Sequence, residues 1–252
     1  MFRGFACLSV ATVALFAQGP ARRIVGGGGD FAMVQAEFGV SNKVVPGAPY
    51  SAQAVTQFTQ TLANGDHIQR TTTASMVRDS QGRTRVERTL GNVGARASAG
   101  RQTRAIVIHD PVAAMSYALD PDSKTVRSTP IRGARLRPNL AERPERASDK
   151  TEDLGTQVVQ GVSAQGTRVT RVIPAGQVGN EKDIDIVTET WYSPDLQVIV
   201  MSKTSDPRFG DSVYQLNSIS RTEPDPALFT VPSDYTTQES RPPRRRGSGR
   251  VY

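Results

Sequence analysis

The sequence has few of the residues that carry catalytic and metal chemistry. Its 252 residues include one cysteine, Cys7, and two histidines, His67 and His109. Cys7 lies in an apolar N-terminal segment, so structural disulfides, cysteine-ligated zinc and a cysteine nucleophile are excluded for the remaining chain. The histidines stand 42 residues apart, without the spacing of a metal motif. We expect no catalytic residue, no metal site and no cofactor.

Long hydrophobic runs are also lacking, except at the N-terminus. Arg3 is followed by an apolar run from Gly4 to Phe16, which is too short to span a membrane but suits the core of a signal peptide. We expect residues 1–21 to be a signal peptide, with cleavage after Ala17, Gly19 or Ala21. The chain would then be exported to the periplasm, the cell envelope or the medium. An uncleaved membrane anchor is the alternative.

The formal net charge of +7 comes from the two ends of the chain. Residues 1–23 and 241–252 contain eight arginines and no acid, and without them 23 basic side chains oppose 24 acidic ones. Specific nucleic-acid binding is therefore not expected. Residues 237–252 are predicted to be a disordered arginine-rich tail, which either solubilises the protein or tethers it to an anionic surface or membrane.

Within the body of the chain the charges are segregated. Residues 68–108 carry a net charge of +6 and residues 178–240 a net charge of −7. Two explanations are open: the two segments face each other or cover solvated strands, or the arginines line a groove for an anionic ligand.

From residue 50 the chain alternates between strand patterns and turn signals. Asn64-Gly65 separates two strand-like segments, 51–62 and 67–78, and predicts a hairpin. Later turn signals, such as Asp120-Pro121 and Ser193-Pro194, divide the chain in the same way. The pattern predicts a mainly β protein: about ten antiparallel strands in a meander, with little helix, curled as a half-barrel, a barrel or a sandwich.

The same pattern sets the domain boundaries. A glycine-rich segment over 22–47 is predicted to be flexible, and 48–236 to be a single β domain with a long loop at 130–152. A terminal turn at 224–229 is predicted to place Leu228 and Phe229 in the core.

Aromatic residues gather near the last strands, and arginines follow an early turn. Trp191, Tyr192 and Tyr214 either line a hydrophobic cavity in a curved sheet or form its core. Arg83 and Arg85 either make salt bridges across strands or contact an anion. These five residues are the candidate ligand-binding residues.

Three segments together resemble a group of exported bacterial proteins that are usually left uncharacterised. They are residues 78–85, with Arg-Asp-Ser-Gln-Gly-Arg, residues 161–168, and residues 191–226, with Trp-Tyr-Ser-Pro-Asp-Leu. The resemblance covers about residues 48–236. More distantly, the late strands with a Ser-Pro-Asp turn and the ending Asp225-Pro226-Ala227-Leu228-Phe229 are similar to LolA-like and RseB-like lipoprotein carriers.

The resemblance implies a curved sheet that holds acyl chains or contacts partner proteins. The function expected is a non-enzymatic envelope protein that binds a hydrophobic or lipid ligand, or a protein partner, through this sheet. The alternative is a structural or interaction module without a ligand pocket, tethered by its basic tail.

Overall fold

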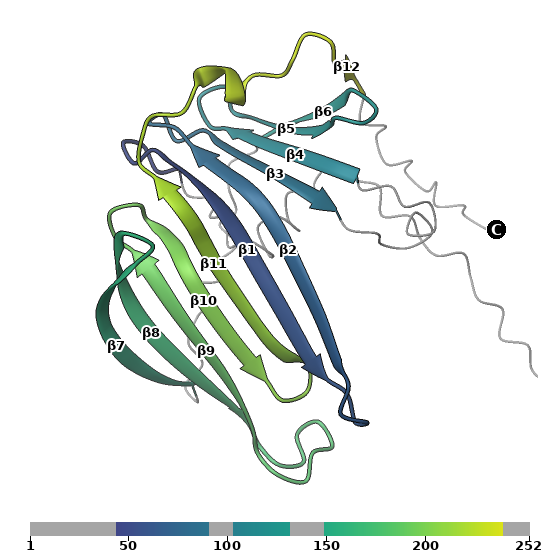
Figure 1. Ribbon diagram of the computed structural model, residues 1–252, viewed down its shortest axis with the longest axis vertical. Coiled ribbons are helices and arrows are strands. Elements are labelled where there is room, and N and C mark those ends of the chain that lie inside the picture. Colours follow the sequence, from purple (N-terminus) through teal and green to yellow (C-terminus); the bar gives the residue numbers. More distant parts are fainter. Residues whose placement is uncertain (1–43, 91–102, 132–148, 239–252) are drawn as a thin grey trace, which may run out of the picture.

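The computed structural model describes residues 44–90, 103–131 and 149–238, which form one large β sheet and a short 3₁₀ helix (Figure 1). The strands, in chain order, are β1 (Tyr50–Thr61), β2 (His67–Arg78), β3 (Thr84–Leu90), β4 (Thr103–Asp110), β5 (Met115–Asp120), β6 (Thr125–Pro130), β7 (Asp149–Val159), β8 (Val162–Ile173), β9 (Ile184–Ser193), β10 (Val198–Asp206), β11 (Gly210–Ser220) and β12 (Thr236–Thr237). The 3₁₀ helix η3 (Pro226–Phe229) lies between β11 and β12.

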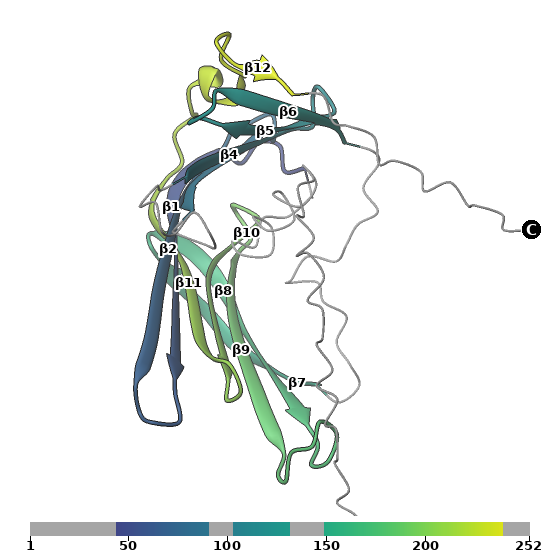
Figure 2. The same ribbon diagram turned by 90° about the vertical axis from the view of Figure 1, so that its right-hand side faces the viewer.

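The sheet is curled but not closed. Its strand order is β12-β6-β5-β4-β3-β2-β1-β11-β10-β9-β8-β7, so β12 and β7 are the two edges. All neighbours are antiparallel except β12, which pairs with β6 in parallel. Figure 2 shows the sheet bending between the strands around β4 and those around β9. The predicted curled antiparallel meander is confirmed, and the barrel and sandwich alternatives are wrong.

The predicted hairpin at Asn64-Gly65 is confirmed, and it sets the register of the sheet. Gly65 has φ of +88°, which glycine adopts without strain, and its N–H donates to the Leu62 carbonyl (2.9 Å). The strands β1 and β2 then pair without interruption from Tyr50 with Arg78 to Thr61 with His67. Because side chains alternate along a strand, this register decides which face each side chain of β1 and β2 occupies.

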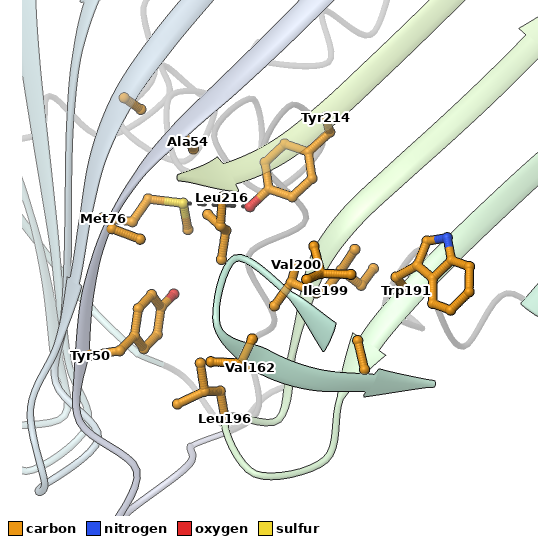
Figure 3. Close-up of a cluster of buried hydrophobic side chains, with 14 of the residues drawn as sticks. Tyr50, Ala54, Met76, Val162, Trp191, Leu196, Ile199, Val200, Tyr214 and Leu216 are labelled. Atoms are coloured by element: carbon orange, nitrogen blue, oxygen red, sulfur yellow. Dashed lines mark hydrogen bonds between the residues drawn. The ribbon is translucent and has the colours of Figure 1, made fainter. Parts of the chain in front are cut away.

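Hydrophobic clusters cover both faces of β2, β3 and β4. Val77 belongs to a cluster with buried residues of β4–β6 and with Phe229 of η3; its face is called the η3 face below. Met76, on the opposite strand face, belongs to a larger cluster with Tyr50, Leu196 and Leu216 (Figure 3); its face is called the far face. A single sheet therefore supports two cores.

Three predictions about segments need correction. Both ends of the predicted loop 130–152 lie in strands, because Pro130 ends β6 and β7 begins at Asp149, while residues 132–148 lie outside the described part of the chain. Phe229 is buried as expected, but Leu228 is 37% exposed, since its carbonyl rather than its side chain meets the sheet. The short strand β12 was not predicted. The expected signal peptide and almost all of the expected glycine-rich segment and tail lie outside the described residues.

Candidate binding surface

The three candidate aromatic residues pack in the protein's own core. Trp191 and Tyr214 are each 8% exposed, and Tyr192 packs against the same cluster. Trp191 pairs with Met201, whereas Tyr214 pairs with Ser202, so the two side chains start from opposite strand faces. Figure 3 shows Ile199 and Val200 between them. Trp191 and Tyr214 therefore enter the same core cluster from opposite faces of their strands.

Trp191 and Tyr214 each bury a polar atom of their own side chain. The Trp191 ring lies against Gly166, where a Cβ would come within 2.6 Å of it, and its Nε1 is buried without a hydrogen-bond partner among the described residues. The Tyr214 hydroxyl donates to the Met76 sulfur at 3.7 Å. Burial raises the pKa of Tyr214 well above its usual range, so this hydroxyl stays protonated at neutral pH.

The two candidate arginines hold the 3₁₀ helix to the sheet. The Arg83 guanidinium bonds to the Asp79 carboxylate at 2.6 Å and stacks over the Phe229 ring at 5.0 Å. Arg85 donates to the Leu228 carbonyl at 3.2 Å and to the Glu87 carboxylate at 2.9 Å. Both side chains are engaged by the protein itself, although their ion pairs lie within one turn and one strand rather than across strands.

Arg78 joins three parts of the chain that are far apart in sequence. It is 5% exposed, and its guanidinium donates twice to the Ala48 carbonyl, at 2.9 and 2.8 Å, and once to the Leu196 carbonyl. It also lies over the Tyr50 ring at 4.8 Å. Burial lowers the pKa of Arg78, and the nearby Tyr50 opposes this effect. The interaction of this cation with carbonyl dipoles and an aromatic ring compensates for its lost hydration.

The residues after Arg78 extend this junction. Asp79 is 1% exposed and accepts the backbone N–H groups of Gln81 (3.1 Å) and Arg83 (2.8 Å). Ser80 donates its N–H and hydroxyl to the Glu223 carboxylate at 3.1 and 3.0 Å. Gly82 has φ of +83°, and a Cβ there would come within 2.9 Å of Val44.

Two of the three segments that carry the sequence resemblance therefore meet at one structural junction. Residues 78–83 contact 44–48 on one side, and Leu196 and Glu223 of the last segment on the other. These contacts explain why the motif contains buried charges and a glycine in the left-handed region. The contacts give the motif a structural role at this junction.

His109 and Asp110 are the last two residues of β4. The Asp110 carboxylate accepts the backbone N–H groups of Val112 and Ala113, each at 2.9 Å, and so forms the turn after the strand. Burial lowers the pKa of His109, and the charge of Asp110 opposes this effect. Among the described residues no group of three His, Cys, Asp or Glu side chains could hold a metal ion.

The exposed part of the sheet is a polar layer. Beyond Ala74 the far face continues as two rows of paired residues, which cross seven strands from β2 to β7 and are rich in hydroxyls. The first row is Thr72, Thr56, Tyr214, Ser202, Thr190, Thr167 and Asp153, and the second is Arg70, Phe58, Ser212, Thr204, Thr188, Val169 and Thr151. These are called the hydroxyl rows. Apart from the buried Tyr214, their side chains are half-buried or exposed.

The η3 face of the same strands is also polar, but it is charged. One of its rows is Thr71, Gln57, Val213, Lys203, Glu189, Arg168 and Glu152. Arg168 bridges Glu189 at 2.7 Å and Glu152 at 3.3 Å. Glu189 of β9 therefore forms a cross-strand ion pair on this face.

A shallow depression of about 430 Å³ lies on the η3 face of β1, β2 and β3. Its lining is richest in hydroxyl groups, with one amide, one carboxylate, one guanidinium and two alanines. The lining residues are Ser51, Ala52, Gln53, Thr73, Ala74, Ser75, Glu87, Arg88, Thr89 and Ser218. None of the five candidate residues lines it, and nothing in the sequence marks it, because its members come from short segments of four strands that only the pairing of the sheet brings together.

No protein-family model and no curated protein matches the sequence. Several solved structures resemble it. An uncharacterised conserved protein from Thermus thermophilus is 9% identical, with a TM-score of 0.41 over 82% of this chain and 95% of its own. A chain of the Pseudomonas aeruginosa MucA/MucB complex is 12% identical, with a TM-score of 0.39 over 74% of this chain and 56% of its own. A LolA superfamily protein from Nitrosomonas europaea is 8% identical, with a TM-score of 0.31 over 78% of this chain and 97% of its own.

All of these TM-scores lie below 0.5, so the likenesses carry no conclusion about the fold family, ligand or partner of this chain. The resemblance to LolA-like and RseB-like carriers stays a prediction. In the described part of the chain, no helix has the length and apolar character needed to cross a membrane.

Proposed function

We propose that this chain is an exported, non-enzymatic binding protein of the cell envelope, and that it binds a protein partner across the hydroxyl rows of its far face. The observation that carries the proposal is the continuous register of these rows across seven strands. At roughly 4.8 Å per strand the rows extend over about 29 Å, which is the width of a protein interface rather than of a small ligand.

The chemistry of the rows favours a polar partner over an acyl chain. Hydroxyl groups donate and accept hydrogen bonds, and their hydration is lost without compensation when a lipid chain covers them. The aromatic residues that could have lined a lipid cavity are engaged elsewhere: Tyr214 contacts Met76 and Trp191 covers Gly166. The chemistry of this surface therefore does not favour a hydrophobic ligand.

Site-specific photo-crosslinking in the native envelope tests the proposal. A photoreactive amino acid replaces Thr190 or Ser202 on the far face and, as matched controls on the same two strands, Glu189 or Lys203 on the η3 face. We expect one common protein adduct from the two far-face positions and none from the controls. The substitution Thr188→Arg, which places a charge in the second row, should abolish that adduct.

Two results would overturn the proposal. One is equal crosslinking from both faces, which would show contact without a preferred surface. The other is a stoichiometric acyl lipid that copurifies with the protein and is detected by native mass spectrometry, because that would favour the lipid carriage implied by the sequence resemblance.

A further inference from the structure

The depression on the η3 face is created by two irregularities of the sheet. In β11 the pairing with β1 jumps from Asn217 opposite Gln53 to Ser220 opposite Ser51. The one extra residue of β11 forms a bulge in which Ser218 has φ of +53°, a left-handed conformation that is uncommon outside glycine. On the other side β3 leaves β2 after Arg88, so Thr89 pairs with β4 alone. The strands separate on both sides of Gln53 and Ser75, and a hollow forms between them.

The side chains in this hollow are arranged in register. Glu87, Ser75 and Gln53 are direct cross-strand partners, so they form one row of a carboxylate, a hydroxyl and an amide. Further hydroxyls border this row, from Ser51, Thr73, Thr89 and Ser218. Such groups can donate and accept hydrogen bonds in several directions at once.

Two charged side chains line the hollow, Glu87 and the buried Arg88, and both are engaged by the protein. Glu87 is paired with Arg85 at 2.9 Å and with Arg104 at 3.6 Å. A charged ligand would have to compete with these pairs, whereas a neutral ligand with many hydroxyls can bond to the free edges of the carboxylate, the amide and the hydroxyls. The volume of about 430 Å³ lies at the lower end of the range of small-molecule sites.

We propose that this depression binds a neutral, polyhydroxylated ligand, a saccharide unit. The site lies on the face opposite the hydroxyl rows, so the inference does not rest on the proposed protein partner. The depression would suit a sugar of an envelope glycan or a free sugar equally. The experiment below distinguishes the two by comparing monosaccharides with disaccharides.

Saturation-transfer NMR on the purified chain tests the inference, with glucose, N-acetylglucosamine and their β-1,4-linked disaccharides as probes. We expect saturation transfer to at least one probe, with a Kd on the order of 1 mM. The variants Gln53→Leu and Ser75→Val, which remove the amide and a hydroxyl from the row, should each weaken binding about tenfold. Tighter binding of the disaccharides would identify a glycan as the source, and equal binding a free sugar.

The control variant is Gln57→Leu. Gln57 is an exposed glutamine on β1 and on the same face, four residues from Gln53 and outside the depression. It should leave sugar binding unchanged, and the unfolding midpoints of the two glutamine variants should agree. Absence of transfer to every probe would overturn the inference. Equal loss in both glutamine variants, or binding of glucuronate in preference to glucose, would do the same.

Discussion

Trp191 and Gly166 lie so close together that neither position can change independently. A Cβ at residue 166 would come within 2.6 Å of the Trp191 ring and 2.9 Å of the Leu154 Cβ. We expect Gly166→Ala to destabilise the fold by about 1–3 kcal/mol, because an added methyl group must displace a packed ring. Urea unfolding measures this, and the cost should shrink when Trp191→Leu is also present. The same cost in both backgrounds would contradict the contact.

Arg78 shows how a buried cation can be structural. Its planar guanidinium reaches the carbonyls of Ala48 and Leu196 at once, and a lysine ammonium has neither the fork nor the reach for that. We expect Arg78→Lys to lower the free energy of unfolding by about 2–4 kcal/mol. The exposed Arg70, changed in the same way, should alter it by less than about 0.5 kcal/mol. Equal small effects at both positions would show that the stability of the junction does not depend on the planar shape of the guanidinium.

His109 links stability to pH. Burial lowers its pKa in the folded state below the usual value of about 6.5, so the folded protein favours the neutral ring. The stabilisation is present above about pH 6.5 and is lost as the pH falls through the folded-state pKa. We expect His109→Asn to reduce the decline in unfolding free energy between about pH 7 and pH 5. An unchanged slope, measured by urea unfolding at several pH values, would contradict this role.

The 3₁₀ helix η3 packs against its face of the sheet and contributes a buried side chain to the core there. Phe229 is 2% exposed and lies under the Arg83 guanidinium, while Phe209 is 60% exposed and lies under the Arg208 guanidinium at 4.9 Å. The two residues are a matched pair that differ in burial. We expect Phe229→Ala to cost about 3–4 kcal/mol and Phe209→Ala less than about 0.5 kcal/mol. Thermal unfolding of the two variants checks this, and similar costs would show that the cation–π contact outweighs burial.

The elements could be predicted from the sequence because each strand ends at a strong local signal. Asn64-Gly65, Ser193-Pro194 and the Asp-Pro pairs mark turns whatever the tertiary structure. The length of β7 could not be predicted, since Gly155, with φ of +76°, interrupts its pattern at a bulge. The short β12 was missed because two residues carry no periodicity.

The candidate site was harder to predict than the strands. Alternation shows that Trp191 and Tyr192 point to opposite faces, but not which neighbours cover them. Gly166 and Leu154 lie beside Trp191 only because β7, β8 and β9 pair in one register. The depression around Gln53 depends on Ser218, whose left-handed conformation no local pattern indicates.

At the scale of the whole molecule, the described parts of the two oppositely charged segments lie side by side in one sheet. The basic segment 68–108 lies mainly in β2–β4 and the acidic segment 178–240 mainly in β9–β11, on either side of β1 in one sheet. Several of these charges pair locally instead, as in Arg83 with Asp79 and Arg208 with Asp206.

The degree of burial changes along the strands of the sheet. The less buried parts should open locally at a lower free-energy cost. In β2 the residues Ala74–Arg78 pair with β1 and β3 and are mostly buried, whereas His67–Thr73 pair with β1 alone and are mostly exposed. The backbone amides of the exposed half depend on one neighbouring strand, so they should open without unfolding the core.

Hydrogen exchange can measure this difference within one strand. We expect amides of His67–Thr73 to exchange at least about tenfold faster than those of Ala74–Arg78, since only the second half is fixed by two neighbours and two cores. Overlapping peptides in mass spectrometry resolve the two halves. A bound partner on the hydroxyl rows should slow exchange around Thr72 and Thr56 and leave Ala74–Arg78 unchanged. Equal protection of both halves in the free protein would mean that the sheet opens as one unit, and that its polar half is as firmly held as its core.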